Sequence, residues 1–166
     1  IALGHRRIAA LVAATDDRSI SELRYRGYLS ALRDHGIEPD GDLVACTGSF
    51  GMDEAYIATR ALASGGADFT AMFIIADAMA IAAIKALEDA GRDVPRDCSV
   101  IAVDGLLLSQ YTRPTLTTMC QPSEQMGEES VRILLDMIER RSGNRSLVLE
   151  STLRAGASVA PASARK

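Results

Sequence analysis

The sequence predicts an α/β fold in which a parallel sheet is flanked by helices. Apolar runs of strand length alternate with segments whose apolar residues recur at helical spacing, and the connections are short. The 166 residues are 48% hydrophobic and 24% charged, a balance typical of a globular chain with one core and not of a disordered one. No apolar run approaches the roughly 18 residues that a membrane span needs.

Each predicted element follows from a local pattern. Ile8–Ala13 is an unbroken apolar run, as in a parallel strand buried on both faces. The helix predicted over 21–35 has apolar residues at helical spacing and ends at Gly36. Further strands are predicted at 43–47, 71–75, 99–103 and Thr117–Cys120, with a last extended segment at 146–153. Further helices are predicted at 52–63, 78–90 and 123–141.

Charge and composition argue against several classes of function. The net charge is −4, and no basic stripe marks a surface for nucleic acid. Three widely separated cysteines fit reduced thiols, with a reducing cytosol as the default compartment, rather than a disulfide framework or a CxxC metal site. Two histidines are too few for a His-based metal or catalytic cluster. We therefore expect no catalytic residues, no metal and no cofactor.

The first residues read as the end of a helix rather than as a natural start. Residues 1–4 are apolar and close with Gly4, the residue type that favours a left-handed C-cap. Neither an initiator Met nor a signal sequence is present. The expectation is a fragment whose natural N-terminal part is absent.

Candidate binding residues follow the predicted strands, because ligands bind beyond the carboxyl ends of strands in an open parallel sheet. Residues 15–18 (Thr-Asp-Asp-Arg) follow the first strand and lead to Arg24, and Phe50 stands in a Gly-Ser-Phe-Gly loop after the second. Asp77 follows the third strand and Asp104 the fourth. No phosphate-binding glycine motif and no GxSxG nucleophile turn is present, so the pattern predicts a binding cleft.

Three of these candidate binding residues also have a purely structural interpretation. Asp77 precedes a predicted helix, where an aspartate commonly caps the N-terminus. Arg24 lies near the start of a helix and needs an anionic or polyhydroxylated partner, or an ion pair with Glu22. Phe50 either stacks on a ligand ring or covers an edge of the core.

A series of motifs resembles the lactose/galactose repressor (LacI/GalR) family of bacterial transcription regulators. GHRRIA at 4–9 opens a strand, RYRGY at 24–28 is similar to the family's RxxGf helix motif, and ADAMA at 76–80 to its NDxmA segment. Residues 94–104 resemble vPxdvsviGfD, and residues 113–122 followed by Met-Gly resemble PxLTTvxqp and mG. The order matches over nearly the whole chain. The family's usual Asn before Asp77 is replaced by Ala76.

The resemblance implies a type I periplasmic-binding-protein-like fold of two lobes joined by crossovers. Residues 1–113 would form the C-terminal lobe, residues 114–146 a returning segment of the other lobe, and residues 147–166 the return and the tail. It also implies a cytoplasmic homodimer that senses a small, carbohydrate-like effector. Operator DNA would be contacted only through an N-terminal helix-turn-helix absent from this chain.

The resemblance also assigns roles to particular residues. Arg24 would grip effector hydroxyl or carboxylate groups, Phe50 would stack on the ring, Asp104 would accept hydroxyl hydrogen bonds, and Gln121 would line the cleft. Asp77 completes the predicted set. The alternatives are a periplasmic sugar-binding protein of a transport system, which the same fold would serve, and a small α/β hydrolase or sugar-phosphate enzyme, for which no nucleophile–base pair is found.

Overall fold

The structure is a computed structural model that describes residues 1–14, 19–139 and 145–162. Its centre is a six-stranded sheet with the order β2-β1-β3-β4-β5-β6. The strands are β1 (Ile8–Ala13), β2 (Val44–Thr47), β3 (Ala71–Ile74), β4 (Ser99–Asp104), β5 (Thr117–Cys120) and β6 (Thr152–Arg154). β1 to β5 pair in parallel, and β6 runs antiparallel to β5. The predicted α/β class and the mainly parallel sheet are confirmed.

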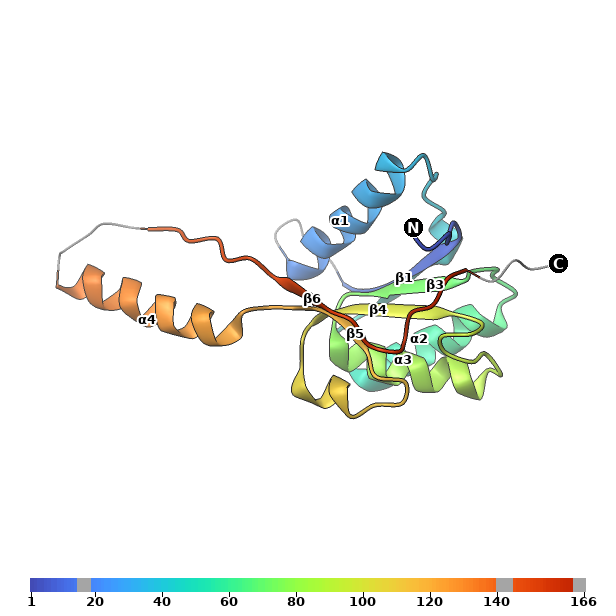
Figure 1. Ribbon diagram of the computed structural model, residues 1–166. Helices are drawn as coiled ribbons and strands as arrows, with labels where there is room; N and C mark the ends of the chain where they lie inside the picture. The colour runs from blue at the N-terminus through green and yellow to red at the C-terminus, as the bar shows by residue number, and fades with distance from the viewer. Residues whose placement is uncertain (15–18, 140–144, 163–166) are drawn as a thin grey trace.

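Helices cover the two faces of the sheet unequally. α2 (Met52–Ser64) and α3 (Asp77–Asp89) pack against one face and against each other, and α1 (Ile20–Asp34) lies on the opposite side (Figure 1). α4 (Ser123–Ile138) extends away from this body as an arm (Figure 1). Two short 3-10 turns, η1 (Gly41–Leu43) and η2 (Leu107–Gln110), complete the described elements.

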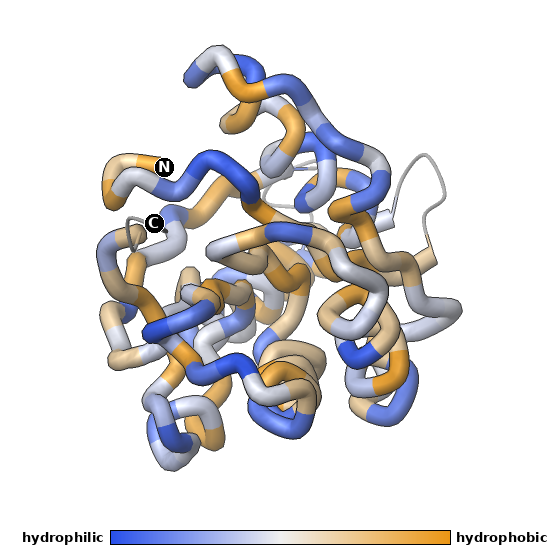
Figure 2. The backbone as a smooth tube through the Cα atoms, turned by 90° about the vertical axis from the view of Figure 1, so that its right-hand side faces the viewer, coloured by the Kyte–Doolittle hydropathy of each residue, from blue (hydrophilic) through white to orange (hydrophobic). Residues whose placement is uncertain are grey.

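The core lies on both faces of the sheet, mainly under the helix pair α2–α3 and to a smaller extent under α1, which contributes Tyr28 and Leu32. Its fully buried side chains include Leu11, Met72, Ile74, Met79 and Leu87, which come from β1, β3 and α3. The tube view shows hydrophobic stretches crossing the middle of the molecule, where the strands lie (Figure 2). Among the described residues, no helix is both long and apolar enough to cross a bilayer.

Most predicted elements are correct to within a few residues, and the differences have simple causes. The second strand loses its first predicted residue, Leu43, to η1, which Asp40 caps by accepting from the backbone N of Asp42. The last extended segment is regular only over Thr152–Arg154, where β5 offers hydrogen-bond partners. η2 was not predicted. Gly4 has φ 92°, a conformation that glycine adopts freely, and it closes a turn in which its backbone N donates to the carbonyl of Ile1; the described residues before it form no helix.

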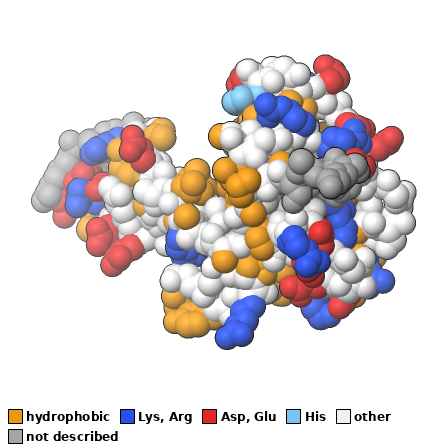
Figure 3. Space-filling model, turned by 45° about the vertical axis from the view of Figure 1, so that its right-hand side comes forward, with side chains coloured by type: hydrophobic (Ala, Val, Ile, Leu, Met, Phe, Trp, Pro, Cys, Tyr) orange, Lys and Arg blue, Asp and Glu red, His pale blue; other side chains and the backbone are white. Residues whose placement is uncertain are grey.

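Most apolar residues of α3 are buried within this chain. They lie almost all around the helix, a pattern that can mark a partner surface, but Met79, Ala82 and Ile84 are at most 7% exposed because α2 and the sheet cover them. Exposed apolar side chains lie elsewhere. Figure 3 shows hydrophobic side chains in a band down the middle of one face, beside the arm that contains α4.

Candidate functional site

Three predicted site residues meet at the carboxyl end of the sheet. The Nη2 atom of Arg24 lies 2.9 Å from Oδ1 of Asp104, and Nε2 of Gln121 donates to the same oxygen at 2.8 Å. A second Arg24 nitrogen donates to the carbonyl of Ile75 at the end of β3. The Arg24 and Asp104 side chains are 17% and 23% exposed, so the pair is sheltered but still reachable. We name Arg24, Asp104 and Gln121 the polar cluster.

The start of α1 places Arg24 in this cluster. Ser19 caps the helix by accepting from the backbone N of Glu22. Ser21 fixes the helix to the end of β1, since its hydroxyl donates to the carbonyl of Ala13 at 2.7 Å and accepts from the same residue's backbone N. Arg24 follows within the next turn. The alternative pairing of Arg24 with Glu22 is wrong, because Glu22 binds Arg26.

Phe50 lies at the same edge of the sheet, after β2, and is 46% exposed. It therefore does not cover an edge of the core. Glu54 holds its loop by accepting from the backbone N of Gly48 at 2.7 Å and from the hydroxyl of Ser49 at 2.7 Å. The hydrogen bonds from Ser49 and Gly48 lower the pKa of Glu54 below its usual value. No contact joins Phe50 to the polar cluster among the hydrogen bonds and ring contacts of the described residues.

Asp77 supports the site from beneath. It is fully buried; Oδ1 accepts from the hydroxyl of Thr118 at 2.5 Å, and Oδ2 accepts from the backbone N of Leu106 at 2.7 Å. The capping alternative is wrong, because Ala76 is the N-cap of α3 and no side chain makes the cap hydrogen bond. Both Asp77 oxygens are thus engaged in joining β5 to the loop after β4.

A hollow of about 540 Å³ opens beside the cluster. Polar and apolar groups share its lining, which consists of Asp104, Gly105, Leu106, Leu107, Gln121, Ser123 and Met126. This composition suits a small ligand that presents hydroxyl groups on one side and carbon on the other. In the described part of the chain, no three His, Cys, Asp or Glu side chains are grouped so that they could hold a metal ion.

The remaining candidates lie outside the cluster or outside the described residues. Residues 15–18 belong to the undescribed part of the chain. His5 is buried at the other end of the sheet, where its ring bonds the Thr70 hydroxyl and the Ala160 carbonyl, and His35 binds the Ala31 carbonyl on α1. Cys46, Cys98 and Cys120 are free thiols, which agrees with the sequence-based expectation.

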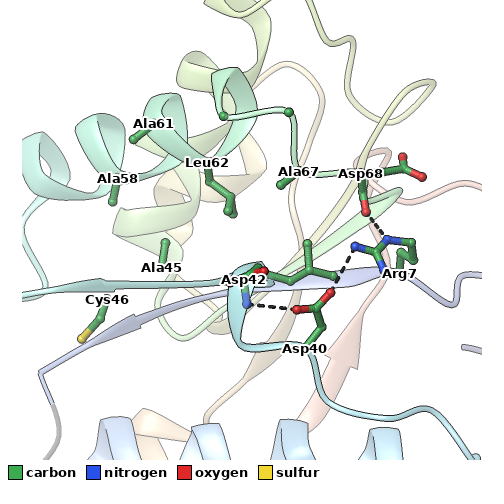
Figure 4. A pocket seen from close by; sticks show the side chains of 13 residues that line it. Arg7, Asp40, Asp42, Ala45, Cys46, Ala58, Ala61, Leu62, Ala67 and Asp68 are labelled. Atoms are coloured by element: carbon green, nitrogen blue, oxygen red, sulfur yellow. Dashed lines mark hydrogen bonds and ion pairs between the residues drawn. The ribbon is translucent and has the colours of Figure 1, made fainter.

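A second cavity, of about 690 Å³, lies between α2 and the outer edge of β2 (Figure 4). Small side chains such as Ala45, Ala58 and Ala61 form its wall. At its rim Arg7 pairs with Asp40 at 3.1 Å and donates to the carbonyl of Asp68 at 2.5 Å. Its charged rim is therefore occupied by internal contacts, and none of the predicted site residues lines it.

Sequence reasoning missed the residues that hold the site loops. Glu54 could have been found from its spacing to a Gly-Ser loop at a helix start, where an acid can accept backbone N–H groups. Thr118 and Arg154 carry no comparable signal, since their contacts span 41 residues to Asp77 and 48 to Leu106. Only the assembled sheet brings them to the loop.

Comparison with known proteins adds a family context. Residues 1–159 match the family model of the periplasmic binding protein-like domain. Over 138 residues the chain is 37% identical to the HTH-type transcriptional regulator MalR of Clostridium butyricum, which covers 83% of this chain and 41% of that protein. The chain thus spans less than half the length of this curated relative.

Solved structures agree with the sequence matches. The transcriptional regulator CelR–cellobiose complex aligns with a TM-score of 0.86 and 36% identity, covering 93% of this chain and 47% of that one. A dimeric Lac repressor with a C-terminal deletion and one amino-acid substitution aligns with a TM-score of 0.89 and 27% identity, covering 96% and 58%. These similarities concern the arrangement described above, including the sheet that carries the polar cluster.

Proposed function

Because the chain belongs to the periplasmic binding protein-like domain family and, within it, to the LacI type of transcriptional regulators, we propose that it senses a small effector and thereby controls operator binding. The regulator acts in the cytoplasm and catalyses no reaction. The transport-protein alternative is not favoured, because curated relatives at 32–37% identity are transcriptional regulators. DNA contact is made outside these 166 residues.

The polar cluster is the observation that carries this proposal. Arg24 offers N–H donors and Asp104 offers carboxylate acceptors 2.9 Å apart, and Gln121 adds an amide. Neighbouring hydroxyl groups of one sugar can accept from the guanidinium and donate to the carboxylate. Because the two charges already balance each other, the site suits a neutral polyol better than an anion. Cellobiose in the CelR complex is a neutral ligand of this kind.

Phe50 and Asp77 have different parts in the proposed site. The exposed ring of Phe50 supplies an apolar face on which a sugar ring stacks. Asp77 is too deeply buried to reach an effector, so its part is to support the loop that carries Asp104. Ala76, which stands where the family usually has Asn, adds no amide to the site.

The position of α4 supports the proposed division into lobes, in which residues 1–113 and 147–166 belong to one lobe and 114–146 to the other. β5 pairs with β4 in the main sheet, which supports placing the point of departure after Cys120 rather than at 114. α4 has no buried residue, and its apolar side chains Met126, Val131, Leu134, Leu135 and Ile138 are 44–67% exposed. In the two-lobe protein this face packs against the other lobe.

We further propose that the regulator is a homodimer and that η2 contributes to the contact. Leu107, Leu108 and Tyr111 are 67%, 59% and 77% exposed within five residues. Such a concentration of exposed apolar side chains marks a partner surface. Sedimentation of the chain should show a dimer that Leu107→Asp disperses, whereas Val148→Asp, at an equally apolar and 90% exposed position, should leave it intact.

Titration with neutral sugars tests the proposed function. A panel of cellobiose, maltose, ribose and matched sugar phosphates is added to isotopically labelled chain, and binding is followed by NMR. We expect a neutral sugar to shift the side-chain signals of Arg24 and Gln121, and Arg24→Met to abolish the response. Arg26→Met, two residues along on the same helix, is the matched control. A panel in which only the sugar phosphates bind would contradict the proposal.

A further inference from the structure

The loop that begins at Asp104 has an unfavourable backbone. Asp104 has φ 135°, the only positive φ at a non-glycine residue among those described. Gly105 follows with φ 80°, and a Cβ there would lie 2.7 Å from atoms of Cys120. A residue held in such a region persists only when surrounding contacts hold it there. The position of the Asp104 carboxylate therefore depends on what fixes residues 105–110.

Arg154 on β6 fixes this loop from outside the polar cluster. Its Nη2 donates to the carbonyl of Leu106 at 3.0 Å and to the hydroxyl of Ser109 at 2.5 Å, and its Nη1 reaches the carbonyl of Gly105 at 3.4 Å. A planar guanidinium can make these contacts together because its donors are held in a rigid fork. Three acceptors within five residues are thus gathered by one side chain.

The contacts of Arg154 end at the loop. None of its hydrogen bonds reaches Arg24, Asp104 or Gln121. Its side chain acts on Asp104 through the loop that begins at Gly105, while its backbone pairs with Thr118 on β5. β6 is also the strand by which the chain re-enters the sheet after α4, so Arg154 connects that return to the candidate binding site.

We propose that Arg154 is a positioning residue that sets the Asp104 carboxylate against Arg24 and Gln121, and that it ties this placement to β6. Because β6 is the strand that follows α4, Arg154 couples the chain's return into the sheet to the placement of Asp104. The coupling gains its regulatory meaning from the proposed function, but the placement of Asp104 can be measured without any effector.

The test compares Arg154→Met with Arg92→Met in the unliganded 166-residue chain. Arg92 is a matched control because its guanidinium also binds a backbone carbonyl, that of Phe69, far from the polar cluster. The readouts are the side-chain NMR signals of Arg24 Nη and Gln121 Nε2, which report directly on Asp104. Arg154→Met should move both signals toward those of solvent-exposed side chains and raise exchange of the Leu106 amide about tenfold or more. Arg92→Met should do neither.

Two further variants test whether Arg154 positions Asp104. Arg154→Lys retains the charge but loses the fork, so we expect intermediate shifts. Ser109→Ala adds no bulk and removes one acceptor of Arg154 together with the hydroxyl's own hydrogen bond to the Leu106 carbonyl. It should give smaller shifts in the same direction if Arg154→Met does not fold. A folded Arg154→Met chain, or a Ser109→Ala chain, with parental Arg24 and Gln121 signals would overturn the proposal. A sugar panel without binding would contradict the proposed function and leave these shifts unchanged.

Discussion

Replacing Asp104 by glycine and by alanine separates the strain of its backbone from the contacts of its side chain. Both variants remove the carboxylate that binds Arg24 and Gln121, so they lose the same contacts. They differ in what φ 135° costs the new residue. Glycine adopts this conformation freely, whereas alanine is strained in it.

The expected difference can be worked from these terms. Holding alanine at such a φ costs about 1–3 kcal/mol. Glycine avoids that cost but loses about 0.5–1 kcal/mol more to the entropy of the unfolded chain. Asp104→Gly should therefore unfold with a free energy higher than that of Asp104→Ala, by about 1 kcal/mol and at most about 2.5 kcal/mol.

Urea unfolding followed by circular dichroism measures this difference, since the chain has no tryptophan to report by fluorescence. Ala157→Gly is the control: Ala157 is exposed, has no positive φ, and keeps its backbone hydrogen bonds to Thr115 as glycine. There glycine should destabilise by about 0.5–1 kcal/mol. If Asp104→Gly is no more stable than Asp104→Ala, the strained geometry at the site is refuted.

Three further predictions concern pH and exposure. The pKa of Glu54 is lowered, so the stabilisation that its carboxylate gives the Phe50 loop is complete above its usual pKa and is lost as pH falls. Protection of the Gly48 amide, measured relative to its intrinsic exchange rate, should fall on acidification in the parent but not in Glu54→Gln. Burial raises the pKa of Tyr28 to about 12, so the stability that its neutral side chain contributes to the fold is lost between about pH 10 and 12. Tyr28→Phe should lose less stability than the parent at alkaline pH. At neutral pH its free energy of unfolding should be about 1 kcal/mol lower, because the hydrogen bond to the Ile8 carbonyl is absent. Amides of α4 should exchange rapidly in a monomeric chain, and strong protection there would contradict the lobe division.

The strands and helices could be predicted because their signals are local. Ile8–Ala13 reads as a buried strand from six consecutive residues, and the structure places it in the interior of the sheet with β2 on one side and β3 on the other. The helix predicted over 123–141 is also present, as α4, and the described residues leave its apolar side chains exposed.

The site was predictable only in part, because its residues meet through the topology of the sheet. The rule that ligands bind beyond strand ends selected Arg24 and Asp104, which lie 80 residues apart and form an ion pair. The same rule could not find Arg154, which lies on the last strand, and it placed Asp77 among the effector-binding residues although its buried carboxylate supports the loop instead. Burial determines the role of Asp77. A carboxylate with no exposed surface needs hydrogen-bond partners inside the protein, and here these are the Thr118 hydroxyl and the backbone N of Leu106.

The most direct test of the account is a crystal structure of the protein with the neutral sugar that binds most tightly in the titration panel. We expect adjacent sugar hydroxyl groups within hydrogen-bond distance of Arg24 and Asp104, with the ring against Phe50 and Gln121 at the edge of the cleft. A sugar bound in the cavity beside Ala45 and Ala58, with the Arg24–Asp104 pair untouched, would contradict the assignment of the polar cluster as the effector site.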